Sequence, residues 1–338
     1  MNPQRIVPWK RTSASVLSAL ILAAIPAAAF AHPPDAPGTP EVVASFNPAA
    51  LETPESIVFD RDGNIYLSLA LTGEIRKIAT DGTQSSFAFL PIGAPLTPCG
   101  GFLAIMGGLT IDNHGNLYAA VASCDPANRG IWRISPAGQA QLLSQLPIEA
   151  LPNGITLHHD HLYVADSALG RVWAVPVEGG PAEVWIQDDS LFAPVGSPFP
   201  GANGIKAFRG EVYVSVSGAG TIIAIPFLAG DAAGAPRVHA VLPAPQGCDD
   251  FAFDVHGSLY CTTDPFRTVI RVDPDGSSEI LLTAADGLDG PTATAFGVHG
   301  DDRFNLYITN AAFPFFSETH QPSLMRVHLG VVGAPIEH

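Results

Sequence analysis

All six tyrosines of this chain occupy the same place in one recurring pattern, and this repetition constrains the fold more than any other feature. Each tyrosine follows a short polar turn and begins an apolar run, with a second apolar segment before the turn and a third after the run. The tyrosines are Tyr66, Tyr118, Tyr163, Tyr213, Tyr260 and Tyr307. Self-similarity at a regular interval is the sequence signature of repeat architectures. The pattern therefore predicts six copies of one supersecondary unit.

Each repeat spans about 45–50 residues and holds apolar segments for up to four strands, which predicts an all-β fold, a six-bladed β-propeller of four-stranded blades. A single meander cannot bury both of its faces, whereas blades packed around an axis do so and keep their edges short. A jelly roll, the alternative all-β class, would not give six equal repeats. The sixth repeat lacks a fourth strand after residues 324–329, so we expect residues 41–46 to supply it and close the ring.

The first 31 residues have the organisation of a secretory signal peptide. Arg5, Lys10 and Arg11 precede an apolar run over residues 16–30, and Ala29-Phe30-Ala31 has the form of a cleavage site. A membrane anchor is the alternative, but it requires about 20 apolar residues. We expect residues 1–31 to be a signal peptide and residues 32–338 to form a single propeller domain. The mature chain would then be periplasmic or secreted, with no membrane span after cleavage.

Export also bears on the four cysteines, because an oxidising compartment makes them disulfide candidates. No two have the C-x-x-C spacing of a zinc or redox site. Cys99 and Cys124 both fall on the loop-rich face of the second repeat and are the favoured pair. Cys248 and Cys261 lie at different heights on neighbouring strands, so the sequence leaves that bridge open.

The charge balance excludes some classes of partner. The chain has 16 basic and 32 acidic residues, a net charge of −16, which argues against nucleic-acid binding. A hydrophobic content of 47% with 14% charged residues excludes an intrinsically disordered chain. The acidic balance is compatible with a bound cation. The expected partner is a small molecule, and the sequence carries no signal for an oligomeric state.

One position in each repeat should face the central channel. When the innermost strands are aligned by their ends, the first residue of each strand falls at Glu55, Gly107, Asn153, Asn203, Asp249 and Thr292. Four of these six positions carry a carboxylate or a carboxamide, and such oxygens are the ligands that a hard divalent cation prefers. Repulsion between Glu55 and Asp249 would be costly without a cation. The alternative is that Asn and Asp merely begin strands after turns.

These positions resemble the motifs of the SMP-30/gluconolactonase/LRE-like family over residues 41–330. Pro54-Glu55-Ser56 is similar to the Glu motif of that family, and Asn203-Gly204-Ile205 is similar to its N-G-[IL] metal motif. Asp249, with residues 250–254 after it, resembles the D-G-x-x-x-D motif. Asn153-Gly154 matches the family Asn that contacts substrate.

The resemblance implies a six-bladed propeller with one divalent metal ion in the channel, usually Ca²⁺, and hydrolysis of a lactone or another ester. It implies that Glu55, Asn203 and Asp249 are metal ligands, that Asn153 contacts substrate and that Asp249 is the catalytic base. Zn²⁺ or Mn²⁺ remain alternatives to Ca²⁺. Two departures concern the substrate: Leu151 stands where gluconolactonases have Arg, and Asp250 stands where the family has Gly.

The fold alone does not fix the reaction, because related propellers include strictosidine-synthase-like lyases and non-catalytic binding proteins. No G-x-S-x-G elbow or dinucleotide fingerprint points to other chemistry. Three long segments, residues 91–106, 188–202 and 311–322, should lie on the ligand-bearing face. Their apolar side chains are Phe102, Met106, Leu191, Phe192, Phe199, Phe313, Phe315 and Phe316.

These side chains favour an apolar lactone or ester as substrate, unless they only pack the loops onto the propeller. Asp166, Asp264 and Asn310 end second strands on the same face, where they could support the site or cap turns. The His158-His159-Asp160-His161 sequence has the residue types of a metal site, but it falls at the turn between two strands at the opposite end of the propeller, so we expect a surface hairpin, with metal binding as the less favoured alternative.

Overall fold

The computed structural model describes residues 1, 37–99, 102–317 and 319–335. The chain divides into two units, Met1–Pro33 and Pro34–His338, and the second holds all the secondary structure given below. The expected signal peptide, residues 1–31, lies outside the described residues apart from Met1. Among the helices in the described ranges, none is long and apolar enough to cross a bilayer.

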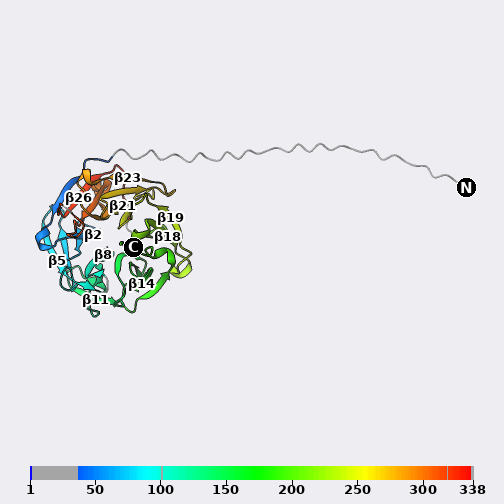
Figure 1. Cartoon of the computed structure of the whole chain (residues 1–338), viewed down its shortest axis with the longest axis horizontal. Coiled ribbons are helices and arrows are strands. Elements are labelled where there is room, and N and C mark those ends of the chain that lie inside the picture. The colour runs from blue at the N-terminus through cyan, green and yellow to red at the C-terminus, as the bar shows by residue number, and fades with distance from the viewer. Residues whose placement is uncertain (2–36, 100–101, 318, 336–338) are drawn as a thin grey trace. The chain divides into compact units, whose positions relative to one another are not determined.

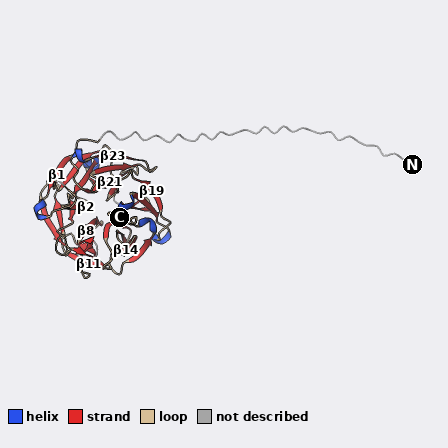
Figure 2. Cartoon of the chain, viewed as in Figure 1, coloured by secondary structure: helices blue, strands red, loops and turns tan. Residues whose placement is uncertain are grey.

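Six four-stranded sheets surround a central axis in the second unit, with β2 and β8 nearer the axis and β5 and β11 towards the outside (Figure 1). Every strand pairing within the described residues is antiparallel, and strands make up nearly half of those residues, with only short helices between them (Figure 2). This arrangement confirms the expected all-β, six-bladed propeller.

The first three blades follow one another in chain order. Blade 1 contains β2 (Pro54–Phe59), β3 (Ile65–Leu69), β4 (Glu74–Ile78) and β5 (Gln84–Phe89). Blade 2 contains β8 (Ile105–Ile111), β9 (Leu117–Ala122), β10 (Gly130–Ile134) and β11 (Ala140–Gln145). Blade 3 contains β12 (Pro152–His158), β13 (His161–Asp166), β14 (Arg171–Pro176) and β15 (Glu183–Gln187).

The last three blades include the one that joins the two ends of the propeller. Blade 4 contains β16 (Ala202–Phe208), β17 (Glu211–Val216), β18 (Thr221–Pro226) and β19 (Arg237–Val241). Blade 5 contains β20 (Phe251–Phe253), β21 (Leu259–Thr263), β22 (Thr268–Val272) and β23 (Ser278–Leu282). Blade 6 contains β24 (Pro291–Phe296), β25 (Asn305–Asn310), β26 (Ser323–His328) and β1 (Glu41–Ser45).

Short elements lie in the connections between these strands. They are β6 (Pro98–Cys99), β7 (Phe102–Leu103) and the 3₁₀ helices η1 (Pro48–Ala50), η2 (Asp189–Leu191), η3 (Ser217–Ala219), η4 (Ala229–Asp231), η5 (Ala284–Asp286) and η6 (Gly300–Phe304).

The N-terminal strand closes the ring, as the sequence predicts. Strand β1 pairs with β26 in antiparallel register, with Glu41 opposite Arg326 and Ser45 opposite Ser323. The Arg326 guanidinium Nε donates to Glu41 Oε1 over 2.6 Å, which adds an ion pair to the backbone ladder. Blade 6 therefore joins both ends of the propeller, so the closure holds the first and last repeats together.

The core lies between blades rather than inside any one of them. Val58 and Tyr66 of blade 1 pack in one cluster with Leu109 and Leu117 of blade 2. The inner strand β2 is buried along its whole length, whereas β5 at the outer edge of the same blade is mostly exposed. Apolar burial therefore increases towards the axis, which fixes the inner strands and the residues at their ends.

Both expected cysteine pairs are disulfides, including the one that the sequence leaves open. Cys99 in β6 is bonded to Cys124, with their Cα atoms 5.2 Å apart. Cys248 is bonded to Cys261 in β21, with a Cα separation of 5.6 Å. The second bridge joins the segment just before β20 to its neighbouring strand, beside Asp249.

Candidate functional site

The oxygen-bearing residues at the starts of the inner strands converge at one end of the channel. Glu55 of β2, Asn153 of β12, Asn203 of β16 and Asp249 before β20 all line one cavity of about 10 Å³. This is close to the smallest space that holds one water molecule. Thr292 of β24 also lines it, and blade 2 contributes Gly108. The structure thus brings together all four residues that the sequence analysis selects.

Glycines next to these positions allow the blades to approach closely enough for the convergence. A Cβ atom on Gly154 would lie 2.4 Å from the carbonyl oxygen of Asn203 in the next blade. A Cβ on Gly204 would lie 2.5 Å from the Asp249 carbonyl oxygen. A larger residue at either position would force the inner strands of adjacent blades apart. This steric limit explains why a glycine follows each asparagine.

A set of hydroxyl groups fixes the backbone at the same level. Each belongs to the second strand of one blade and donates to a carbonyl oxygen at the site position of the next. The contacts are Ser68 Oγ to Gly107 O (2.8 Å), Ser215 Oγ to Asp249 O (2.6 Å), Thr262 Oγ1 to Thr292 O (2.8 Å) and Thr309 Oγ1 to Glu55 O (3.3 Å). The sequence analysis missed these residues. Each follows a repeat tyrosine by two positions, a signal that the alignment of repeats could have found.

Two serines orient the carboxamide side chains. Asn203 Nδ2 donates to Ser217 Oγ over 2.9 Å and to Asp249 Oδ1 over 2.7 Å. Asn153 Nδ2 contacts Ser167 Oγ at 3.3 Å. Because the NH₂ group of Asn203 is engaged in this way, its Oδ1 is the atom that remains for an electropositive ligand.

Two carboxylates at the cavity, those of Glu55 and Asp249, lie where their negative charge is disfavoured. Glu55 Oε2 is buried and has no hydrogen-bond partner among the described residues. Burial, followed by the charges of Asp264 and Asp250, raises the pKa of Glu55 to about 8. Burial and then the Glu55 charge raise the pKa of Asp249 well above its usual range. An unpartnered Glu55 oxygen beside a second carboxylate whose negative charge is also disfavoured fits a divalent cation, whose charge would offset the penalty on both groups.

Two further aspartates lie near this centre and have different environments. Asp250 lines the cavity and accepts from Lys206 Nζ at 2.6 and 2.7 Å, so one cation of the chain already compensates it. Asp264 has a buried Oδ1 without a partner in the described part of the chain. Burial, and then the charge of Asp289, raise its pKa to about 7. Asp264 therefore belongs with the uncompensated acids.

The other two strand-ending residues are structural caps. Asp166 Oδ1 accepts from the backbone nitrogens of Leu151, Ala168 and Leu169, and its Oδ2 accepts from Trp173 Nε1. Asn310 Nδ2 donates to Ser323 Oγ over 3.1 Å, and its Oδ1 accepts from the Asp289 nitrogen. Of the three strand-ending residues, only Asp264 has unsatisfied polar atoms.

The loop over residues 311–322 is attached to the propeller through Asp289. Its Oδ2 accepts from Ser317 Oγ at 2.8 Å, Thr319 Oγ1 at 2.5 Å and Gln321 N at 3.1 Å. The rings of Phe313 and Phe315 in this loop are stacked 5.1 Å apart. These contacts hold an aromatic segment over one sector of the face where the inner strands begin.

An apolar cavity of about 360 Å³ separates this loop from the η1 region. It is lined by Pro48, Ala49, Leu51, Thr53, Ala312, Pro314, His320 and Pro322. Phe315 and Phe316 remain 47% exposed nearby in the chain. Met106 and Leu191 differ from expectation, because both are fully buried in interblade clusters rather than at a pocket rim.

Comparison with known proteins gives matches in structure only. No protein-family model matches the chain, and neither does any curated protein sequence. A luciferin-regenerating enzyme superposes with a TM-score of 0.65 at 14% identity, over 85% of this chain and 95% of its own. A calcium-binding protein, regucalcin, from Agrobacterium tumefaciens gives 0.63 at 16% identity, over 89% of this chain and 97% of its own.

A gluconolactonase from Xanthomonas campestris gives a TM-score of 0.61 at 18% identity, over 88% of this chain and 96% of its own. These three proteins are ones that the motif resemblance leads us to expect, and the superpositions extend over nearly their whole length. At such low identity the similarity concerns the fold. The chain therefore has the propeller fold of luciferin-regenerating enzyme, regucalcin and gluconolactonase.

Proposed function

We propose that this protein is a metal-dependent hydrolase of a lactone or ester with apolar character. The observation that carries the proposal is the cavity of about 10 Å³ at which Glu55, Asn203 and Asp249 meet, with Glu55 Oε2 buried and unpartnered within the described chain. These three residues would hold the cation. Their donor atoms are all oxygens, which favours Ca²⁺ over the softer ions, with Mn²⁺ or Zn²⁺ as alternatives.

The chemistry that such a cation supplies is polarisation of the ester carbonyl and acidification of a bound water. Asp249 would accept the proton of the attacking water as general base. One of its oxygens is already held by Asn203 Nδ2 at 2.7 Å, which orients the carboxylate and leaves the other oxygen for the proton. Asn153 would hydrogen-bond the substrate.

The surroundings of the site favour an apolar substrate. Leu151 is buried in a position where gluconolactonases have an arginine, so no guanidinium is available there for sugar hydroxyls. The apolar cavity of about 360 Å³ lies beside Thr53, two residues before Glu55, and has the volume of a small-molecule pocket. We propose that this cavity takes the apolar part of the substrate.

We also propose that the protein is exported to the periplasm or secreted. The basic start and apolar run of residues 1–31 support this, and so do two disulfides in a chain that leaves no free cysteine among its described residues.

Metal analysis of the purified mature protein, followed by a lactone and aryl-ester panel with and without chelator, tests the proposal. We expect bound divalent metal and hydrolysis that is lost on chelation and in Asp249→Ala. Turnover that survives both treatments would contradict it. Chelation that lowers Tm without any hydrolysis would indicate a non-catalytic binding propeller, and products without added water would indicate a lyase.

A further inference from the structure

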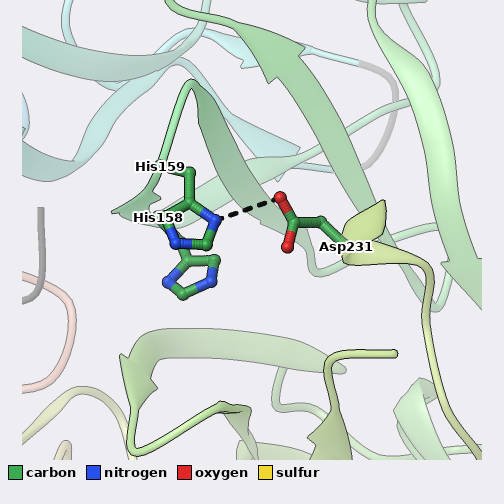
Figure 3. A group of neighbouring side chains, drawn as sticks. All are labelled: His158, His159 and Asp231. Carbon is green, nitrogen blue, oxygen red and sulfur yellow. Dashed lines mark hydrogen bonds and ion pairs between the residues drawn. The ribbon is translucent and has the colours of Figure 1, made fainter. Parts of the chain in front are cut away.

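A second cluster of metal-binding side chains lies at the opposite end of the inner strands. His158 ends β12, His159 is in the hairpin turn that follows, and Asp231 lies in η4 between β18 and β19 of blade 4 (Figure 3). One nitrogen from each histidine and one oxygen from Asp231 lie within 4.8 Å of one another. The closest approach is His159 Nδ1 to Asp231 Oδ2, at 3.1 Å.

Neighbouring aromatic groups hold these side chains in place. The His158 ring lies parallel to Phe227, with centroids 4.0 Å apart and an interplanar angle of 10°. Trp185 Nε1 donates to the Asp231 carbonyl oxygen over 2.7 Å, which fixes the η4 segment. Packing of this kind reduces the entropy that the side chains would lose on binding an ion.

The backbone is constrained at two of the three positions. His159 has φ +50° and Asp231 has φ +57°, both in the left-handed region that non-glycine residues seldom adopt. In Figure 3 the His159 ring and the Asp231 carboxylate face each other across the boundary between the two blades. His159 and Asp231 are 72 residues apart in the sequence, and both have a constrained backbone at the place where their side chains meet. This agreement between two distant segments is consistent with a preformed binding site.

The donor set differs in chemistry from that of the cavity at Glu55. Two imidazole nitrogens and one carboxylate oxygen suit Zn²⁺, Ni²⁺ or Cu²⁺, whereas Ca²⁺ prefers oxygen ligands only. Three protein ligands with open positions for water are a common arrangement for such ions. The side chains of His159 and Asp231 are 61% and 33% exposed, so an ion can reach them from solvent.

We propose that His158, His159 and Asp231 bind a divalent transition-metal ion that links blade 3 to blade 4. The proposal does not depend on the proposed hydrolase function, because the cluster lies at the other end of the strands and uses a different donor set. A bound ion would stabilise the folded chain by mass action, since its ligands come from two blades that separate on unfolding.

Titration of the metal-stripped full chain with Zn²⁺, in the presence of saturating Ca²⁺, tests the proposal by calorimetry. His159→Asn and Asp231→Asn are suitable variants, because Asn tolerates a positive φ. We expect one Zn²⁺ per chain outside the Glu55 cavity and binding roughly tenfold or more weaker in each variant. His114→Asn is the matched control, since His114 lies in the corresponding hairpin of blade 2.

The Cu²⁺ form provides a second measurement that does not depend on affinity. Its electron paramagnetic resonance spectrum should show coupling to two imidazole nitrogens, reduced to one in His159→Asn. Zinc binding that is unchanged in both cluster variants, or that is lost in Glu55→Gln instead, would overturn the proposal. Absence of zinc binding by the unmodified chain would overturn it as well.

Discussion

Acidic residues lie at both ends of the inner strands, and the end that carries Glu55 includes carboxylate oxygens that no donor in the described chain satisfies. At the far end, Asp112 accepts from the backbone nitrogens of His114 and Asn116, from Asn116 Nδ2 and from the Tyr118 hydroxyl. At the near end, where the inner strands begin, Glu55 Oε2 has no hydrogen-bond partner within the described residues. Acidic residues at the two ends therefore have different roles, and the number of hydrogen bonds that each carboxylate accepts distinguishes them.

The pKa directions agree with this distinction. Burial raises the pKa of Asp112, but its hydrogen bonds outweigh burial, and the net shift is downward. For Glu55 and Asp249, burial and neighbouring negative charge act in the same direction, and both pKa values rise. A carboxylate that the fold stabilises as an anion is structural, whereas one that it destabilises marks a place where a cation or a proton is expected.

The largest effect should follow from replacing the acid that we propose as base. Asp249→Asn keeps the shape of the side chain but removes its charge, so ester hydrolysis should fall by about 10²–10⁴-fold. Steady-state kinetics on the best substrate of the panel measures this. Asp112→Asn is the matched control and should keep kcat/KM while lowering Tm. Equal losses of activity in the two variants would remove the functional distinction between the two ends.

Stability should change in opposite directions at the two ends when metal is absent. At pH 9 Glu55 is ionised and buried, so Glu55→Gln should raise the free energy of unfolding of the metal-free protein. Asp112→Ala removes hydrogen bonds to a charged group and should lower it by about 1.5–3 kcal/mol. Urea unfolding with chelator present measures both. A loss of stability in Glu55→Gln would show that this carboxylate contributes to folding.

The pH dependence of the metal-free protein sharpens the same comparison. Glu55 has its pKa raised from 4.5 to about 8 and Asp264 from 3.8 to about 7, so the unfolded chain binds fewer protons than the folded chain between these values. Stability should therefore fall as pH rises from about 4.5 to 8. Tm measured from pH 5 to pH 9 should show this slope with chelator and lose most of it with Ca²⁺. A chelator-treated protein whose Tm rises over this range would contradict the prediction.

Much of the fold could be predicted because its determinants are local and repeated. The tyrosine repeat indicates six blades, and the unpaired segment at residues 41–46 indicates how the ring closes. The register of the inner strands then selects Glu55, Asn153, Asn203 and Asp249, because a propeller places equivalent positions of every blade around one axis. Because the blades are related by rotation about this axis, residues that align in the sequence repeats lie close together in space.

The remaining features depend on contacts that no repeat encodes. Lys206, which lies 44 residues from Asp250 in the sequence, forms an ion pair with it. Asp264 Oδ1 is buried without a hydrogen-bond donor among the described residues, and the sequence gives no sign of this. The loops have no periodicity, so the burial of Met106 and Leu191 could not be read from sequence. The cluster of His158, His159 and Asp231 likewise joins a hairpin to a distant connection, which explains why the sequence alone favours a surface hairpin over a metal site.

The smallest predicted effect concerns the repeated tyrosines themselves. The Tyr118 hydroxyl donates to Asp112 Oδ2 over 3.0 Å, so Tyr118→Phe should lower the free energy of unfolding by about 1.5 kcal/mol, the lower end of the range for a hydrogen bond to a charged group. In blade 3 the aligned acid is replaced by His158, and Tyr163 packs edge-on against Trp185 and Phe227.

Tyr163→Phe preserves those ring contacts and should therefore cost less than Tyr118→Phe, and neither change should alter hydrolysis. Urea unfolding of the two variants side by side measures the difference. Equal costs would mean that the tyrosine repeat stabilises the blades through ring packing alone, and that Asp112 owes its lowered pKa to backbone and amide donors. A larger loss of stability in Tyr118→Phe than in Tyr163→Phe would show that the Tyr118 hydroxyl has a specific role. That role is to donate one of the hydrogen bonds that keep the Asp112 carboxylate ionised.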